Sequence, residues 1–179
     1  MSSVPWNDKM RRLNAEWIAP EEVTSKVCTH YLESLEWMAQ VTLNPSPRLF
    51  ALSARFLFGS YWQRFRHMAD QQRHQPLAVG ILRADHRLEA RFFTQDGTGC
   101  HLIDHQTGRR MATYNPISGE RVFTQDLGSA SVVYFMRYDM RDQRWKIEQY
   151  VQELPRGWHK APYSLSTFSI TERASGRDQ

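Results

Sequence analysis

The segment "CHLIDH" at residues 100–105 groups a cysteine, two histidines and an aspartate, side chains that commonly bind metals. In a strand, which rises about 3.3 Å per residue, His101 and His105 share a face but lie about 13 Å apart. The ligands of a single zinc ion instead lie within about 2 Å of it. Glycines at 97, 99 and 108 flank the segment and favour a hairpin over a helix. The sequence therefore predicts polar strand residues here, no metal site and no cofactor.

Nucleophilic catalysis leaves no recognisable motif in this chain. The members of a Ser-His-Asp or Cys-His arrangement need only be close in space, so one sequence does not identify them. Cys28 falls at helical spacing from Val23, Val27 and Tyr31 and is most simply a small core residue. We predict no catalytic residues, and we leave open whether the protein is an enzyme, with a non-enzyme favoured.

Arginines are concentrated in residues 48–73 and form a candidate basic stripe: Arg48, Arg55, Arg64, Arg66 and Arg73. Against one aspartate they give this segment a local charge of +4, whereas residues 21–41 carry four glutamates and one lysine, a local charge of −3. The simple interpretation is two neighbouring helices with complementary exposed edges. The alternatives are contacts with phosphates, an acidic partner or a membrane surface. Nucleic acid is the less favoured partner.

The composition is that of one soluble domain with short extensions. Hydrophobic residues make up 41% of the 179 residues, which suffices for a core, and the net charge is +4. Cys28 and Cys100 give no disulfide framework, so nothing requires an oxidising compartment. The first 17 residues lack the apolar run of a signal peptide, and no uncharged run approaches the roughly 20 residues of a membrane span. We therefore expect a cytoplasmic protein with no membrane span.

Two helices are expected in the first half of the chain. Pro20 and two following glutamates suit a helix start, and apolar residues at helical spacing extend that helix to about Val41. The prolines of "LNPSP" (43–47) break it. A second helix is predicted over 48–74, rich in aromatic residues and therefore largely buried.

From Leu77 the pattern changes to short alternating runs separated by turn residues, which indicates strands. We predict strands over 77–82, 87–95, 99–105, 109–114, 120–126, 130–140 and 144–153. Helices followed by an antiparallel meander give an α+β fold, with N-terminal helices packed on a strongly curved antiparallel sheet. The expected organisation is an arm (1–20), one domain (21–155) and a flexible C-terminal tail (156–179).

The strand over 130–140 is apolar on both faces: alternate residues from Val132 to Tyr138 share one face, and Val133 and Phe135 the other. A strand of this kind is buried on both sides. One face meets the helices, and we expect the other to be covered by a second subunit or a partner. The candidate interface residues are Val132, Tyr134, Met136, Tyr138, Trp145 and Ile147.

This order of elements resembles the NTF2-like superfamily, in which a curved sheet forms a cone around helices. Three segments carry the resemblance: "FGSYWQRFRHMADQQ" is similar to the second helix of such domains, "LIDHQTGRR" to their central hairpin, and "YFMRYDMRDQRWKIEQY" to their closing hairpin. The closing hairpin is also similar to that of the C-terminal domain of cyanobacterial and chloroplast division proteins. The resemblance covers roughly residues 21–153.

The resemblance implies either an interaction module or a small-molecule pocket inside the cone, because fold does not fix function. Such cones can hold acids, histidines and tyrosines in an apolar cavity, as in isomerases and dehydratases. Asp104 is one candidate, and the other pocket-lining candidates are Tyr31, Tyr61, Trp62, His101, Tyr114 and Asp139. We predict a non-catalytic module that binds a protein partner or a second copy as a homodimer. The alternative is a small-molecule enzyme of the isomerase or dehydratase kind.

Overall fold

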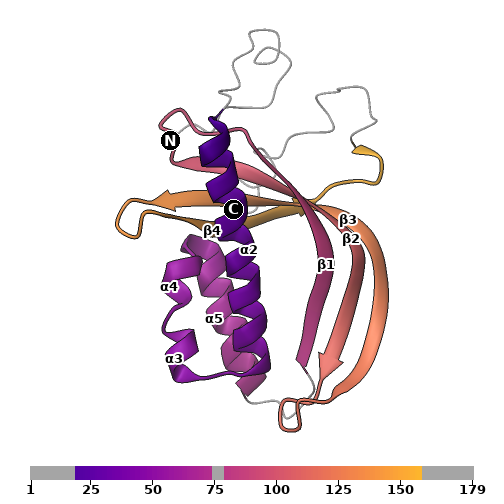
Figure 1. Ribbon diagram of the computed structural model, residues 1–179. Coiled ribbons are helices and arrows are strands. Elements are labelled where there is room, and N and C mark those ends of the chain that lie inside the picture. The colour runs from indigo at the N-terminus through magenta and orange to yellow at the C-terminus, as the bar shows by residue number, and fades with distance from the viewer. Residues whose placement is uncertain (1–18, 74–78, 159–179) are drawn as a thin grey trace, which may run out of the picture.

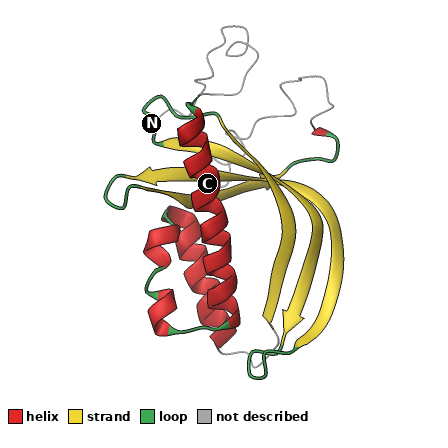
Figure 2. Ribbon diagram, in the orientation of Figure 1, coloured by secondary structure: helices red, strands yellow, loops and turns green. Residues whose placement is uncertain are grey.

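The computed structural model describes residues 19–73 and 79–158 of the chain. Within them, helices α2 (Glu21–Leu43), α3 (Pro47–Phe50), α4 (Ser53–Phe56) and α5 (Gly59–Arg73) precede the strands β1 (Val79–Arg91), β2 (Gly99–Tyr114), β3 (Arg121–Asp139) and β4 (Arg144–Glu153). The strands pair antiparallel in the order β1-β2-β3-β4 and form one open sheet. Figures 1 and 2 show the helices gathered on one side of this strongly bent sheet. The predicted α+β class is confirmed.

Helix α2 begins after Pro20 and carries Glu21 and Glu22 in its first turn, where carboxylates face the positive end of the helix dipole. One side of the helix is buried, and its residues recur at spacings of three and four: Val27, Tyr31, Ser34, Trp37 and Val41. The predicted first helix is therefore confirmed, and it extends two residues beyond Val41.

The predicted second helix over 48–74 is wrong as a single element, because the chain forms α3, α4 and α5 there. Between α4 and α5, Leu57 is extended and pairs with Ile147 of β4 as an isolated parallel bridge. The amide of Phe58 donates to the Ile147 carbonyl at 2.9 Å. Leu57 is 1% exposed. The segment between α4 and α5 therefore lacks helical hydrogen bonds, and its extended backbone places the Leu57 side chain in the core.

The seven short strands predicted from the sequence are four long ones. Runs that looked separate belong to the same strand, and "LIDHQTGRR" lies inside β2 instead of forming a hairpin. Gly108 and Gly128 have left-handed φ values of 58° and 67°, and the register shifts beside them as in β-bulges. A bulge and a turn use the same residue types, which explains the error. The turns near Gly97, Gly119 and Asp142 are confirmed.

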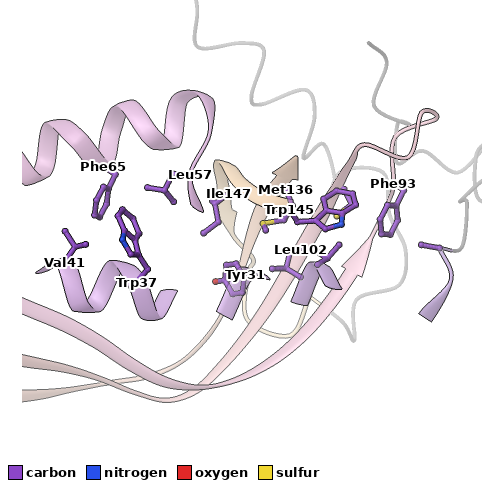
Figure 3. Packing of buried hydrophobic residues seen from close by; sticks show 13 residues of the cluster. Tyr31, Trp37, Val41, Leu57, Phe65, Phe93, Leu102, Met136, Trp145 and Ile147 are labelled. Carbon is purple, nitrogen blue, oxygen red and sulfur yellow. The ribbon is translucent and has the colours of Figure 1, made fainter. Parts of the chain in front are cut away.

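The main core lies between the helices and the inner face of the sheet. Trp37 stacks on Phe56 with ring centroids 5.0 Å apart, and it also contacts Phe65. Figure 3 shows Trp37 and Phe65 at one end of this cluster and Leu102, Met136 and Trp145 of the strands at the other, with Tyr31 and Ile147 between them. Burying each such side chain contributes roughly 1.5–3 kcal/mol, so this cluster dominates the stability of the fold.

A smaller cluster lies on the outer face of the sheet, opposite the main core. Ile103 and Val133 are buried there against Leu154, with Val151 and Trp158 packed around them. The Leu154 amide donates to the Ser131 carbonyl at 2.8 Å. The second apolar face predicted for this strand therefore exists, but the chain's own residues 154–158 cover part of it. Residues 1–18 and 159–179 of the predicted arm and tail lie outside the described residues.

Gly99 marks a close approach between the start of β2 and the outer face of β3. A Cβ at this position would lie 2.6 Å from Cζ of Phe135 and 3.0 Å from Cγ2 of Thr94. We expect Gly99→Ala to lower the free energy of unfolding by about 1–3 kcal/mol, because the rigid ring must move. Urea denaturation measures this change.

Gly80→Ala is the matched control, because the nearest atom there is Sδ of Met111, on a flexible side chain. Its expected effect is below about 1 kcal/mol. Equal losses in the two variants would contradict the tight packing at Gly99.

Candidate functional site

Asp104 is a fully buried acidic residue on the inner face of β2, and three side chains bind it. Tyr31 of α2 donates its hydroxyl hydrogen to Oδ2 at 2.8 Å, and Nε2 of Gln106 donates to the same oxygen at 2.8 Å. Nδ1 of His86 on β1 lies 3.0 and 2.9 Å from the two carboxyl oxygens. A buried acid needs such partners, because an unpaired one costs several kcal/mol.

Strand pairing brings these groups together. In the β1–β2 ladder, His86 lies opposite Gln106, and Leu88 lies opposite Asp104. The side chains of these two strand pairs therefore all point to the helix side of the sheet. Tyr31 belongs to the buried stripe of α2 and meets Asp104 from the helix layer. Tyr31 and Asp104 were candidates from the sequence, whereas His86 and Gln106 were missed. Only the strand register could have indicated them, and the sequence does not give it.

A row of tyrosines continues from this cluster. The ring of Tyr134 lies 5.3 Å from that of Tyr31, 6.1 Å from that of Tyr61 and 5.6 Å from that of Tyr150. Burial raises the pKa of Tyr134 and of Tyr61, and it raises the pKa of Tyr31 well above the usual value. These hydroxyls therefore stay protonated at neutral pH and act as neutral hydrogen-bonding groups.

The outer end of this row opens on a small depression, the tyrosine hollow, lined by Tyr61, Arg64, Phe65, Met68 and Tyr150. Its volume is about 180 Å³. Small-molecule sites usually measure about 300–1,000 Å³, so the hollow suits a single side chain or a very small ligand. Asp104 and Tyr31 do not line it and are fully buried. The carboxyl group is sealed from this entrance.

The other predicted pocket residues lie apart from the Asp104 cluster. Trp62 donates from Nε1 to Oγ of Ser53 at 2.9 Å. Asp139 accepts from Nζ of Lys146 at 2.7 Å in the β3–β4 turn. Tyr114 ends β2, and His101 lies on the outer face between the rings of Phe92 and Phe135. The structure thus brings together only Tyr31 and Tyr61 of the six, through Tyr134.

Most of the predicted interface residues are used inside this chain. Met136, Trp145 and Ile147 belong to the main core, and Tyr134 and Tyr138 pack against it. Val132 is 5% exposed. The reason is that these alternate residues of β3 and β4 lie on the face of the sheet that the helices cover. A partner would have to use other side chains.

The five arginines do not share one face. Arg48 lies in α3, Arg55 in α4 and Arg64, Arg66 and Arg73 in α5. Residues two positions apart on an α-helix are separated by a rotation of about 200°, so Arg64 and Arg66 point in nearly opposite directions. The Arg66 guanidinium lies over the Trp62 ring, 5.2 Å from its centroid. The five arginines therefore do not line one continuous helix, and a basic stripe with a binding role stays a prediction.

A second polar arrangement crosses three strands on the outer face. Nδ1 of His105 lies 2.9 Å from Oγ of Ser131, and its Nε2 lies 3.0 Å from Oε1 of Glu89. These residue types can form a nucleophilic triad. Here the indole of Trp158 stacks on the imidazole, with centroids 5.8 Å apart, and covers the group. The arrangement ties β1, β2 and β3 together beneath residues 154–158.

Within residues 19–73 and 79–158, no group of three or more histidine, cysteine, aspartate or glutamate side chains is placed to hold a metal ion. No helix in the same part of the chain is long and apolar enough to cross a membrane.

Comparisons with known proteins add evidence on the fold. No protein-family model matches the chain, and no curated protein matches it. Among solved structures, it is similar to the intermembrane space region of the chloroplast protein ARC6. The TM-score is 0.52 at 11% sequence identity, over 74% of this chain and 95% of that one. At this identity the likeness concerns the fold alone. It supports the expected resemblance to a chloroplast protein domain, whereas membership of the NTF2-like superfamily stays a prediction.

His101 makes the stability of the fold sensitive to acid. Burial lowers the pKa of its imidazole from the ordinary 6.5 to about 4, and a hydrogen bond with the Phe92 backbone opposes this only in part. Between these two values the unfolded chain binds a proton that the folded chain does not. Stability therefore falls as the pH drops from 6.5 to 4, by roughly 3 kcal/mol.

We expect His101→Phe to remove this part of the acid sensitivity, because a phenyl ring fits between Phe92 and Phe135 and does not titrate. Urea unfolding at a series of pH values gives the slopes to compare. His67→Gln, on the exposed surface of α5, is the control and should keep the wild-type slope. A His101→Phe variant that loses stability as steeply as the wild type would refute the assignment.

Proposed function

We propose that this domain is a non-catalytic module that binds proteins and that associates with a second copy of itself. The observation that carries the proposal is an apolar surface at the far end of the sheet. Around the β2–β3 turn, Ile117 is 93% exposed, Val122 65% and Phe123 58%. Large apolar side chains clustered in water commonly mark an interaction site. Figure 1 places this turn beyond the ends of α2 and α5.

Strand pairing extends the surface across the sheet. Leu82 of β1 lies opposite Met111, and Thr113 lies opposite Phe123. Met111 and Thr113 are two residues apart on β2, so Leu82, Met111 and Phe123 share one face. We call these three residues, together with Ile117 and Val122, the hairpin-end patch. It spans three strands, which is a width that suits another protein better than a small ligand.

A second copy is the partner that the strand edge favours. β4 pairs with residues 132–139 of β3, so residues 121–127 have β2 on one side and no described strand on the other. Two such edges can pair antiparallel about a twofold axis perpendicular to the sheet, and this symmetry keeps the same face of both strands on one side. The two patches would then form one continuous apolar face. The bulge at Gly128 limits the length of the shared edge.

Sedimentation velocity over a range of protein concentrations tests this proposal. We expect a monomer–dimer equilibrium that Phe123→Glu shifts strongly to monomer, because the substitution places charge in the apolar contact. Met140→Glu is the control: Met140 is 72% exposed in the β3–β4 turn, at the other end of β3. A wild-type protein that is monomeric at every concentration, or a Phe123→Glu dimer as strong as the wild type, would argue against self-association through the patch.

The Asp104 cluster favours a second candidate function, a small-molecule enzyme of the isomerase or dehydratase kind. His86 contacts Asp104 through Nδ1, and its Nε2 has no hydrogen-bond partner among residues 19–73 and 79–158. Acid–histidine pairs of this kind can move protons. Against this candidate stand the full burial of Asp104 and the small volume of the tyrosine hollow.

Hydrogen–deuterium exchange at the α-carbon of cyclohexanone, followed by NMR in D₂O, separates the two candidates. For a binding module we expect the protein to give the same exchange rate as buffer. A protein-dependent rate that is lost in Asp104→Asn, a variant of equal size, would favour the enzyme and overturn the non-catalytic assignment. The cytoplasmic location stays a prediction from the sequence.

A further inference from the structure

The β3–β4 turn, α4 and α2 enclose a second depression, the turn hollow, lined by His30, Arg55, Asp142, Gln143 and Arg144. Its volume is about 460 Å³, which lies within the usual range of about 300–1,000 Å³ for small-molecule sites. Figure 1 shows the β3–β4 turn next to α4, at the opposite end of β3 from the hairpin-end patch. None of its lining residues belongs to the Asp104 cluster or to that patch.

His30 presents a hydrogen-bond donor to this hollow. Its Nδ1 accepts from the backbone amide of Trp145 at 3.2 Å, which fixes the proton of the neutral ring on Nε2. Burial, and then the nearby charge of Arg144, lower the pKa of His30, so the ring is neutral at pH 7. Nε2 lies on the opposite edge of the ring from β4 and has no hydrogen-bond partner among the described residues.

Two more donors in the hollow are uncommitted. Arg55 is exposed and forms no ion pair within residues 19–73 and 79–158, and the same part of the chain offers no partner to the side-chain amide of Gln143. Gln143 also has a left-handed φ of 49°, a backbone conformation that costs a non-glycine residue free energy. Gln143 lines the same hollow as Arg55.

The other charges around the hollow are already paired. Arg144 donates from Nη2 to Glu33, and its guanidinium lies over the Phe56 ring, 4.8 Å from the centroid. Asp142 accepts from Nζ of Lys146, which is buried and also binds Asp139. Because one lysine is shared by two aspartates, these paired groups keep a net charge of −1, which the guanidinium of Arg55 offsets. Among the described residues, the Arg55 guanidinium, the His30 Nε2–H, the Gln143 side-chain amide and the buried Nε of Arg144 have no hydrogen-bond partner.

From this excess of free donors we infer that the turn hollow binds a small organic oxyanion, through a phosphate or carboxylate group held by Arg55, His30 and Gln143. Guanidinium and N–H donors form charge-assisted hydrogen bonds with such oxygens. Because Arg55 offsets the excess negative charge of the two aspartates, the hollow exerts little long-range attraction, and affinity depends on these directed bonds. The site is therefore expected to discriminate oxyanions from chloride at equal ionic strength.

An NMR titration of the isotope-labelled protein tests this inference with four probes: glycerol 3-phosphate, inorganic phosphate, succinate and sodium chloride at matched ionic strength. We expect saturable shifts of the Gln143 and Arg144 amides and of the Arg55 Nε resonance with at least one oxyanion and none with chloride. A stronger response to the two phosphates identifies a phosphate site, and a stronger response to succinate identifies a carboxylate site.

Two variants and a control locate the binding. Arg55→Gln removes the free guanidinium and is expected to weaken binding about tenfold or more. Gln143→Gly removes the amide at a position where glycine relieves the backbone, so it should weaken binding while keeping or raising stability. Arg48→Gln removes an equal charge from α3 and should leave the affinity unchanged. Shifts that chloride reproduces, that do not saturate, or that Arg55→Gln and Arg48→Gln reduce equally would overturn the inference.

Discussion

The packing of helix α2 against the sheet depends on the buried carboxyl group of Asp104. Tyr31 reaches it from α2, His86 from β1 and Gln106 from β2, so one side chain joins the helix layer to the sheet. The helix must sit where Tyr31 can donate, because leaving a buried acid or hydroxyl unpaired costs more than most single apolar contacts contribute. The same hydrogen bonds to the Asp104 carboxyl group limit its chemical reactivity. A carboxyl group whose oxygens already accept from three neighbours, and which no solvent reaches, is poorly placed to take a proton from a substrate.

The β-bulges bend the sheet and thereby determine which of its residues are exposed. The insertions beside Gly108 and Gly128 bend β2 and β3, and Figure 2 shows the two ends of the sheet pointing in different directions. One end encloses the helices and is filled by aromatic rings. The other end leaves the helices, and there Val122 and Phe123 are both exposed. The proposed association surface is thus a consequence of the bend, which carries the far end of β3 away from the main core and beyond the reach of β4.

The outer face and the β3–β4 turn show two ways in which the chain completes its own surfaces. On the outer face of the sheet, Trp158 stacks on His105, and Leu154 packs against Ile103 and Val133. Residues 154–158 thus cover part of the apolar outer face. In the turn, buried Lys146 binds two aspartates and the Ala54 carbonyl and so fixes β4 to α4. Within the described part of the chain, the donors of Arg55, His30 and Gln143 have no partner, because that turn is held in place without them.

The sequence by itself determined the class of the fold, the first helix, the turns between the long strands and the presence of apolar residues on both faces of residues 130–140. These features depend on local preferences and on periodicity, which neighbouring residues specify. It did not determine that Gly108 and Gly128 are bulges, that the second helical segment is broken at Leu57, or which face of β3 the helices cover. Each of these depends on a partner distant in the chain: a strand register, the Ile147 carbonyl and the helix layer. The association of Asp104 with His86, of Ser131 with His105, and of Arg55 with Gln143 was settled only by the tertiary structure, because residues far apart in the chain meet only after the sheet has bent around the helices.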